Sequence, residues 1–129
     1  MSAGVGAKAE REEGRRGPRL PVDLEASLGG RSPRKARAVD LSLVGCLLRT
    51  EATLARGAVL DLTLGLPDGP LRTKGRVAEA TLDGEAPPSP RSFLAGIEFL
   101  SLGAADEARL RGFLDAEAKR RRGANTPPA

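Results

Sequence analysis

A strict alternation of apolar and polar side chains constrains the fold more than any other feature of the sequence. Five apolar residues share one parity, with polar residues or a proline between them: Leu20, Val22, Leu24, Ala26 and Leu28. This period of two places the apolar side chains on one face of an extended chain, so it predicts a half-buried strand. A chain with such a strand must cover the apolar face with further strands or with a helix.

Turn-forming residues divide the rest of the chain into similar short segments. Gly29 to Pro33 has the composition of a hairpin loop, Pro67-Asp68-Gly69 predicts a tight turn, and Asp83 to Pro90 predicts a flexible loop. Gly75 lies inside the segment from Leu71 to Leu82, which is long for one strand, and is a candidate bulge or close-packing point. The segments predicted as strands are 20–28, 34–41, 45–50, 59–66, 71–82 and 93–100.

The hydrophobic period changes after Leu102. Ser101 is a candidate N-cap, and Leu110, Phe113 and Leu114 fall on one face of a helix that is expected to end near Ala118. Six strands joined by hairpin-like connections, followed by one helix, predict an all-β fold with a C-terminal helix. A six-stranded antiparallel β-barrel removes exposed sheet edges by closing on itself. An open sheet covered by the helix and an OB-like barrel are the alternatives.

The length of 129 residues predicts one domain with a single core. Residues 1–14 have no hydrophobic periodicity and are expected to be a disordered leader, and residues 119–129 a basic disordered tail. The ordered domain is expected over residues 15–118. No apolar run approaches the roughly 20 residues that a transmembrane helix needs, and Cys46 has no partner for a disulfide. These features predict a soluble, cytoplasmic protein.

The amino-acid composition excludes several kinds of chemistry. The chain has no histidine and only one cysteine, so it cannot assemble a zinc cluster or a histidine-based catalytic triad. We therefore expect that it is not an enzyme and that it carries no cofactor. Cys46 follows an apolar segment and is expected to be a small core residue.

The short sequence from Asp40 to Gly45 separates two apolar segments and has two interpretations. The side chains of Asp40 and Ser42 can hydrogen-bond to nearby backbone N–H groups, and Gly45 can adopt a positive φ, so the sequence predicts a self-supporting turn. Alternatively, the same polar groups form part of a ligand site.

Basic residues are gathered in clusters, although the net charge is only +4. Such clusters are compatible with a solvated surface, with a nucleic-acid interface or with a site for a phosphorylated small ligand. For the last cluster, compensation of the negative end of the helix is the simplest explanation. The clusters lie at Arg15, Arg16 and Arg19, at Arg31, Arg34, Lys35 and Arg37, and at Lys119 to Arg122.

Two of these features, in their order and spacing, resemble the PilZ domain family. Arg15 and Arg19 match the family's R-x-x-x-R element, with Arg16 as an additional basic residue. Asp40, Ser42 and Gly45 match its D/N-x-S-x-x-G element. The segment Gly96-Ile97-Glu98-Phe99 resembles the last strand of the family. The resemblance covers roughly residues 15–114 and implies a six-stranded barrel of the split-barrel type.

The resemblance also implies a ligand, the bacterial second messenger cyclic di-GMP. The ligand-binding residues carried over from the family are Arg15, Arg16, Arg19, Asp40, Ser42 and Gly45. Forked guanidinium donors suit both phosphate oxygens and the O6/N7 edge of guanine, and a carboxylate can accept hydrogen bonds from the donor edge of guanine. The chain would then act as a receptor that passes the signal to a partner protein.

Two other functions remain as alternatives. One is a PilZ-like adaptor that binds no nucleotide and acts by protein contact alone. The other is binding of single-stranded nucleic acid on an OB-like barrel. The nucleic-acid hypothesis is the weaker one, because aromatic residues make up only 2% of the chain and such proteins commonly stack bases on aromatic rings.

Overall fold

The computed structural model describes residues 19–29, 33–84 and 91–125. The predicted leader at residues 1–14 lies outside this part of the chain, as do most of the predicted loop at 83–90 and the last four residues. The elements are β1 (Leu20–Leu28), β2 (Arg34–Leu41), β3 (Gly45–Thr50), β4 (Val59–Leu66), β5 (Gly69–Leu82), β6 (Phe93–Phe99) and α2 (Ala104–Asn125).

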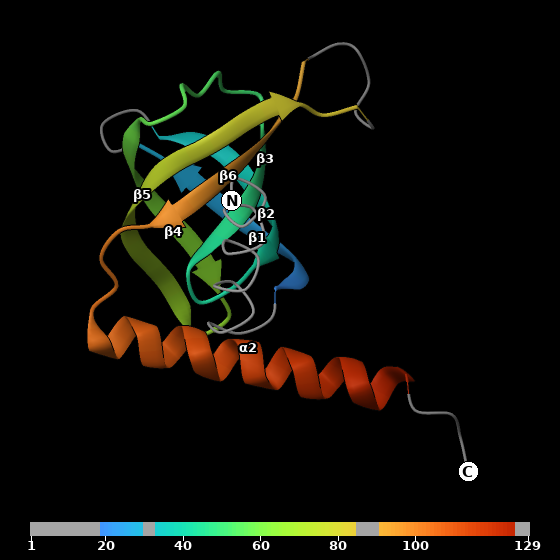
Figure 1. Ribbon diagram of the computed structural model, residues 1–129. Helices are drawn as coiled ribbons and strands as arrows, with labels where there is room; N and C mark the ends of the chain where they lie inside the picture. Colours follow the sequence, from blue (N-terminus) through green and yellow to red (C-terminus); the bar gives the residue numbers. More distant parts are fainter. Residues whose placement is uncertain (1–18, 30–32, 85–90, 126–129) are drawn as a thin grey trace, which may run out of the picture.

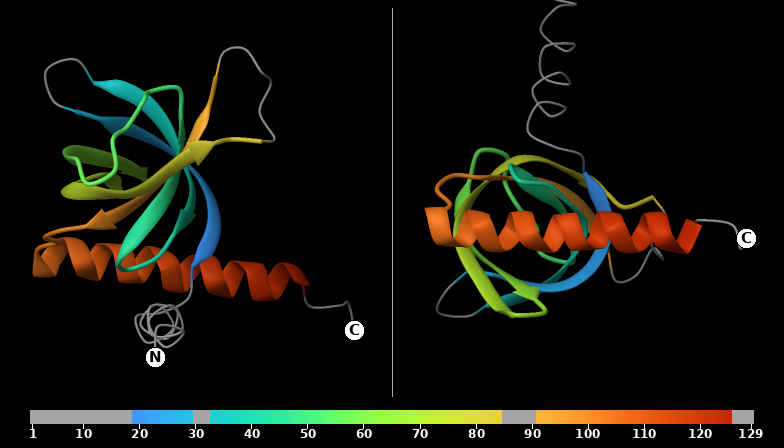
Figure 2. Two further views of the ribbon diagram at one scale, coloured as in Figure 1. Left: turned by 45° about the horizontal axis from the view of Figure 1, so that its top comes forward. Right: turned by 90° about the horizontal axis from the view of Figure 1, so that it is seen from below.

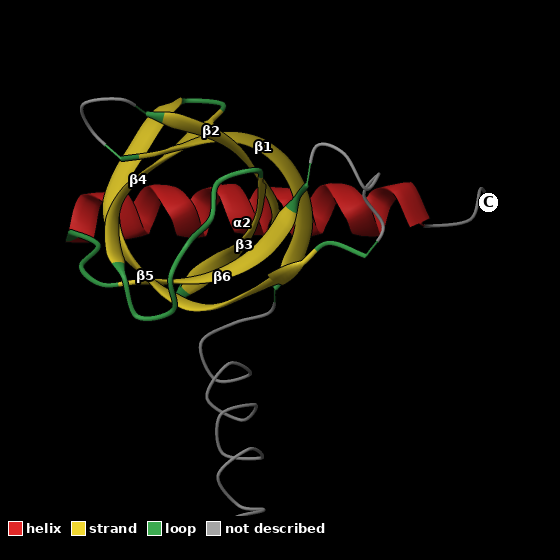
Figure 3. Cartoon of the chain, turned by 90° about the horizontal axis from the view of Figure 1, so that it is seen from above, coloured by secondary structure: helices red, strands yellow, loops and turns green. Residues whose placement is uncertain are grey.

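The six strands form a closed barrel with the order β1-β2-β3-β6-β5-β4, in which every pair is antiparallel (Figure 1). Figure 3, viewed along the barrel, shows the ring of strands with α2 crossing behind it. The closure between β1 and β4 is short, because only Ala26–Leu28 pairs with Leu62–Leu64. Within the part of the chain that the structure describes, the first half of β1 therefore has no strand neighbour on the β4 side. The predicted barrel is confirmed, and the open sheet is excluded.

The core is aliphatic, as the low aromatic content requires. Alternate residues of each strand point inward, and the largest fully buried side chains come from β2, β3, β4, β5 and α2: Leu41, Leu48, Leu62, Leu64, Leu71, Val77 and Leu110. Cys46 is also buried in this cluster, as expected.

Gly75 is a close-packing point and not a bulge. A Cβ at this position would lie 2.4 Å from Ile97 Cγ2 on β6, so a side chain would not fit without movement. The irregularity in β5 lies instead between Val77 and Glu79, where the register against β6 shifts. The strand also begins at Gly69, earlier than the expected Leu71, because Leu66 pairs with Gly69 directly across the turn.

Helix α2 covers one end of the barrel (Figures 1 and 2). Its buried face includes Leu110 and Leu114, which join the core, as the predicted helical face required. Arg109 fixes the helix to the β4–β5 turn through Asp68 Oδ1 at 2.9 Å and the carbonyl of Gly69 at 2.7 Å. Gly69 has a φ of +128°, which favours glycine and confirms the predicted turn.

Both ends of α2 differ from the prediction. Ser101 is not the N-cap, because the helix begins at Ala104 and the first helical hydrogen bond runs from Glu107 N to the carbonyl of Gly103, at 2.8 Å. The helix also continues past Ala118 to Asn125, so part of the expected tail is helical. Ion pairs from Glu117 to Arg120 and Arg121 support this extension, and basic residues are favourable near a helix C-terminus.

Within the described residues, no helix is long and apolar enough to cross a membrane.

Candidate functional site

The segment between β2 and β3 forms a tight turn that its own residues hold. Ser42 N donates to the carbonyl of Gly45 at 2.9 Å, and Val44 N donates to Ser42 Oγ at 3.2 Å. The Ser42 hydroxyl lies 3.4 Å from the same Gly45 carbonyl, and only 3% of the residue is exposed. The predicted self-supporting turn is therefore confirmed for Ser42. The structure places this hydroxyl inside the turn and away from solvent.

Gly45 is required by lack of space and not by a positive φ. Among the described residues, the glycines with positive φ are Gly29, Gly57 and Gly69, so the expected left-handed conformation at Gly45 is wrong. A Cβ at Gly45 would lie 2.2 Å from the carbonyl oxygen of Ile97 on β6. The close approach of β6 at the first residue of β3 thus explains the glycine and ties the turn to the last strand.

Asp40 joins the turn to the segment that precedes β1. Its Oδ2 lies 3.2 Å from a terminal nitrogen of Arg19, and the two side chains are 27% and 42% exposed. Asp40 also stands opposite Pro21 in the β1–β2 register. Its other carboxylate oxygen, Oδ1, is buried and has no hydrogen-bond partner among the described residues. The structure thus brings Arg19 and Asp40 together and leaves one carboxylate oxygen as an unused acceptor.

Of the predicted site residues, Arg19, Asp40, Ser42 and Gly45 lie in the part of the chain that the structure describes. Arg15 and Arg16 lie outside it.

Arg121 reaches the same region from the far end of α2 and was not predicted as a site residue. One of its terminal nitrogens donates a hydrogen bond to the carbonyl of Pro21, which immediately follows Leu20 at the start of β1. Its Nε lies 3.8 Å from Glu117 Oε1. The contact joins residues 100 positions apart, so no local sequence signal could have indicated it.

Cys46 lies directly after the turn, and its thiol is unreactive. Burial raises the pKa of the Cys46 thiol to about 12, and the negative charge of Asp40 adds to this effect. A thiol with this pKa stays protonated at neutral pH and is a poor nucleophile. Within the described residues, no group of histidine, cysteine, aspartate or glutamate side chains could hold a metal ion.

Several solved structures, one of them an isolated PilZ domain, are similar to this chain. The isolated PilZ domain of YcgR from Escherichia coli, solved with c-di-GMP, is 17% identical with a TM-score of 0.65, and the match covers 85% of this chain and 96% of that one. The Bacillus subtilis inhibitor of motility MotI/DgrA is also 17% identical with a TM-score of 0.65, over 80% of this chain and 51% of that one. These identities establish likeness of fold.

MrkH from K. pneumonia in its apo state is 21% identical with a TM-score of 0.67, over 81% of this chain and 52% of that one. The chain therefore spans about half the length of the MotI/DgrA and MrkH chains. No similar curated protein was found. A family model for the PilZ domain matches residues 10–116, which is most of the sequence. The chain belongs to the PilZ domain family.

Proposed function

We propose that this protein is a cyclic di-GMP receptor whose site joins the arginines before β1 to the β2–β3 turn. The observation that carries the proposal is the contact between Arg19 and Asp40 at 3.2 Å, because it brings one residue of each sequence element together at a partly exposed position. The structures of YcgR, MrkH and PlzA with bound c-di-GMP add support from the same fold.

The chemistry of the two residues suits this ligand. A guanidinium has five N–H donors, so Arg19 can keep its contact with Asp40 and still offer donors to a phosphate or to the O6/N7 edge of guanine. The Asp40 side chain is 27% exposed whereas its Oδ1 is buried, so Oδ2 is the oxygen that can accept a hydrogen bond from a guanine N–H group. Arg15 and Arg16, four and three positions before Arg19, would supply further cations for the two phosphodiester charges.

Ser42 and Gly45 have a different role in this proposal. The Ser42 hydroxyl is engaged within the turn, and Gly45 lies against the β6 backbone. We assign both as positioning residues that hold Asp40 where it can meet Arg19 and the ligand. A Ser42→Ala variant should consequently lose affinity together with stability, whereas Asp40→Asn should lose affinity with little change in stability.

The receptor function is tested by calorimetric titration of the full chain with cyclic di-GMP. We expect binding by the intact protein and at least about ten-fold weaker binding by Arg19→Ala and by Asp40→Ala, which corresponds to about 1.4 kcal/mol. The matched control is Arg56→Ala, because Arg56 is exposed and lies outside both elements. Absence of binding by the folded intact protein would refute the proposal.

We further propose that the bound state is passed to a partner protein. Two phosphodiester charges would neutralise part of the arginine cluster, and a ligand that orders a segment changes the surface that a partner meets. The nucleotide-independent adaptor would behave differently. In that case the intact protein would not bind cyclic di-GMP, and Arg19→Ala and Asp40→Ala would leave the cellular phenotype intact.

A further inference from the structure

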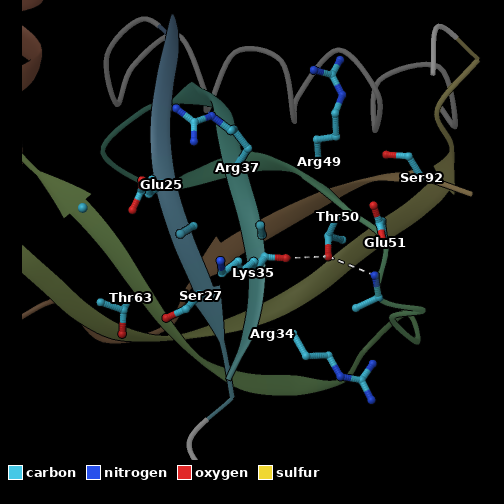
Figure 4. A pocket seen from close by; sticks show the side chains of 14 residues that line it. Glu25, Ser27, Arg34, Lys35, Arg37, Arg49, Thr50, Glu51, Thr63 and Ser92 are labelled. Atoms are coloured by element: carbon cyan, nitrogen blue, oxygen red, sulfur yellow. Dashed lines mark hydrogen bonds between the residues drawn. The ribbon is translucent and has the colours of Figure 1, made fainter. Parts of the chain in front are cut away.

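A second feature of the barrel is a cavity of about 1040 Å³ formed by strands β1 to β4 and the residues that follow β3 (Figure 4). None of Arg19, Asp40, Ser42 and Gly45 lines it. Of the β2 residues that line the cavity, Arg37 is the one closest to Asp40. Arg34 and Lys35 lie six and five positions before Asp40, which is about 16–20 Å along an extended strand. The cavity is thus distinct from the proposed cyclic di-GMP site.

The cavity has an excess of positive charge. Four cationic side chains line it, Arg34, Lys35 and Arg37 from β2 and Arg49 from β3, against the two carboxylates of Glu25 and Glu51. Figure 4 shows these four side chains, which come from neighbouring strands and extend in different directions.

Two of the cations stand directly opposite each other. Arg37 pairs with Arg49 in the β2–β3 register, and like charges opposite each other across a strand pair are destabilising. Each is compensated by a carboxylate that is not part of the cavity wall, Arg37 by Asp23 and Arg49 by the buried Asp83 at 2.6 Å. Arg37 and Arg49 are therefore neighbours across the β2–β3 pair, and their charges are compensated by carboxylates that do not line the cavity.

The other two cations are available to a ligand. Within the described part of the chain, Arg34 and Lys35 are exposed and form no ion pair, although Glu25 and Glu51 line the same cavity. The backbone around Lys35 is fixed, because Thr50 Oγ1 donates to the Lys35 carbonyl at 3.4 Å and accepts a hydrogen bond from Ala52 N at 3.0 Å. The dashed lines in Figure 4 mark these bonds.

The wall also supplies space and neutral polar groups. Ala26, Ala36 and Ala52 line the cavity with small side chains, so its volume reaches the size of pockets that hold nucleotide-sized ligands. Ser27 and Thr63 stand opposite each other on β1 and β4 and add hydroxyl groups.

We infer that this cavity is a second binding site, for a small organic anion that carries two or more phosphate groups. Arg34 and Lys35 are the first two residues of β2 and point to opposite faces of the sheet, Arg34 opposite Leu28 and Lys35 opposite Ser27. Their long side chains would therefore reach the phosphate oxygens from the two sides of the strand end. Arg37 and Arg49 would contribute the donors that their carboxylate partners leave unused. The inference is independent of the cyclic di-GMP proposal, because the two sites share no lining residue within the described part of the chain.

The test is a titration of the full chain with ATP and with inorganic tripolyphosphate in a magnesium-free buffer of low ionic strength, with adenosine as the uncharged probe. We expect both phosphate compounds to bind and adenosine not to bind. The double variant Arg34→Gln/Lys35→Gln should weaken binding at least about ten-fold. The charge-matched control Arg56→Gln/Lys119→Gln, at two exposed positions outside the cavity, should bind as the intact protein does.

The same samples separate this inference from the proposed function. Asp40→Ala should keep its affinity for ATP, and Arg34→Gln/Lys35→Gln should keep its affinity for cyclic di-GMP. Binding of ATP without binding of cyclic di-GMP would refute the proposed function alone. Equal affinity of the two double variants for ATP, or no ATP binding by the intact protein, would overturn the second site.

Discussion

Gly45 is the residue at which the turn, the last strand and the family's sequence element meet. Replacement by alanine would place a Cβ 2.2 Å from a backbone oxygen of β6, and a backbone cannot yield as a flexible side chain does. We expect Gly45→Ala to lower the free energy of unfolding by about 2 kcal/mol or more, as overpacked sites do. Urea denaturation measures the change.

Gly96 provides the matched control for this substitution. It lies on β6, directly beside β3, but a Cβ there would meet no atom within 4 Å. Gly96→Ala should therefore change stability by less than about 0.5 kcal/mol or increase it slightly. A similar loss in both variants would show that the glycine composition of the sheet matters and not the contact with Ile97.

Cys46 offers a probe of how tightly the core beside the turn is closed. Because burial raises its pKa to about 12, the thiol is both protonated and shielded in the folded protein. We expect no reaction with a disulfide reagent at pH 8 on the time scale of minutes, and full reaction in denaturant. Rapid labelling of the native protein would contradict the tight packing of β3.

At the residue scale, the sequence predicted the contacts that are local and missed those that are not. The Ser42 turn could be predicted because its hydrogen bonds span three residues or fewer. The space restriction at Gly45 depends on Ile97, and the contact of Arg121 depends on Pro21, so both arise only after the chain has closed into a barrel.

At the scale of elements, α2 is held to the barrel by a small apolar face. Leu110 is fully buried, whereas Lys119 on the same helix is exposed. We expect Leu110→Ala to reduce the free energy of unfolding by about 2–4 kcal/mol, because it removes buried methyl groups and leaves a cavity. Lys119→Ala should remain within about 0.5 kcal/mol of the intact protein. Thermal unfolding followed by circular dichroism distinguishes the two, and equal effects would show that the helix does not pack through Leu110.

The strands were predicted more closely than the helix ends. Alternation and turn residues mark strand limits locally, and four of the six strands have the predicted bounds. Which strands pair is a property of barrel closure, so the neighbours of β6 could not be predicted from the pattern. The C-terminal end of the helix was predicted too early in the sequence. Its last turns have no apolar face that a pattern could reveal, and are held by the ion pairs of Glu117 and by the contact of Arg121 with β1.

For the whole molecule, ionic contacts at the surface predict a sensitivity to acid. Hydrogen bonds from Arg37, Arg109 and Arg120 hold the pKa values of Asp23, Asp68 and Glu117 below their usual range. The unfolded chain therefore binds more protons than the folded protein at low pH, and stability rises with pH. Stability from these groups is present above the unfolded pKa values of about 4 and is lost as the pH falls through the lower folded values.

Urea unfolding at pH 6, 4 and 3 measures this dependence. We expect the midpoint to fall progressively below pH 4, and the fall to be smaller in the double variant Asp23→Asn/Asp68→Asn. A midpoint that stays constant from pH 6 to pH 3 would show that these exposed pairs contribute nothing measurable.

The family membership confirms the prediction that this chain is not an enzyme.

The short closure between β1 and β4 has a consequence for the association of this barrel with other chains. Among the described residues, the first half of β1 has no strand neighbour on the β4 side. Arg121 of α2 donates a hydrogen bond to the Pro21 carbonyl, and Figure 2 shows α2 passing the start of β1. Unpaired backbone groups of this kind accept an additional strand from another chain. We expect a chain shortened before Arg121 to lose this contact and to accept an additional strand more readily at the start of β1, beside Arg19 and Asp40.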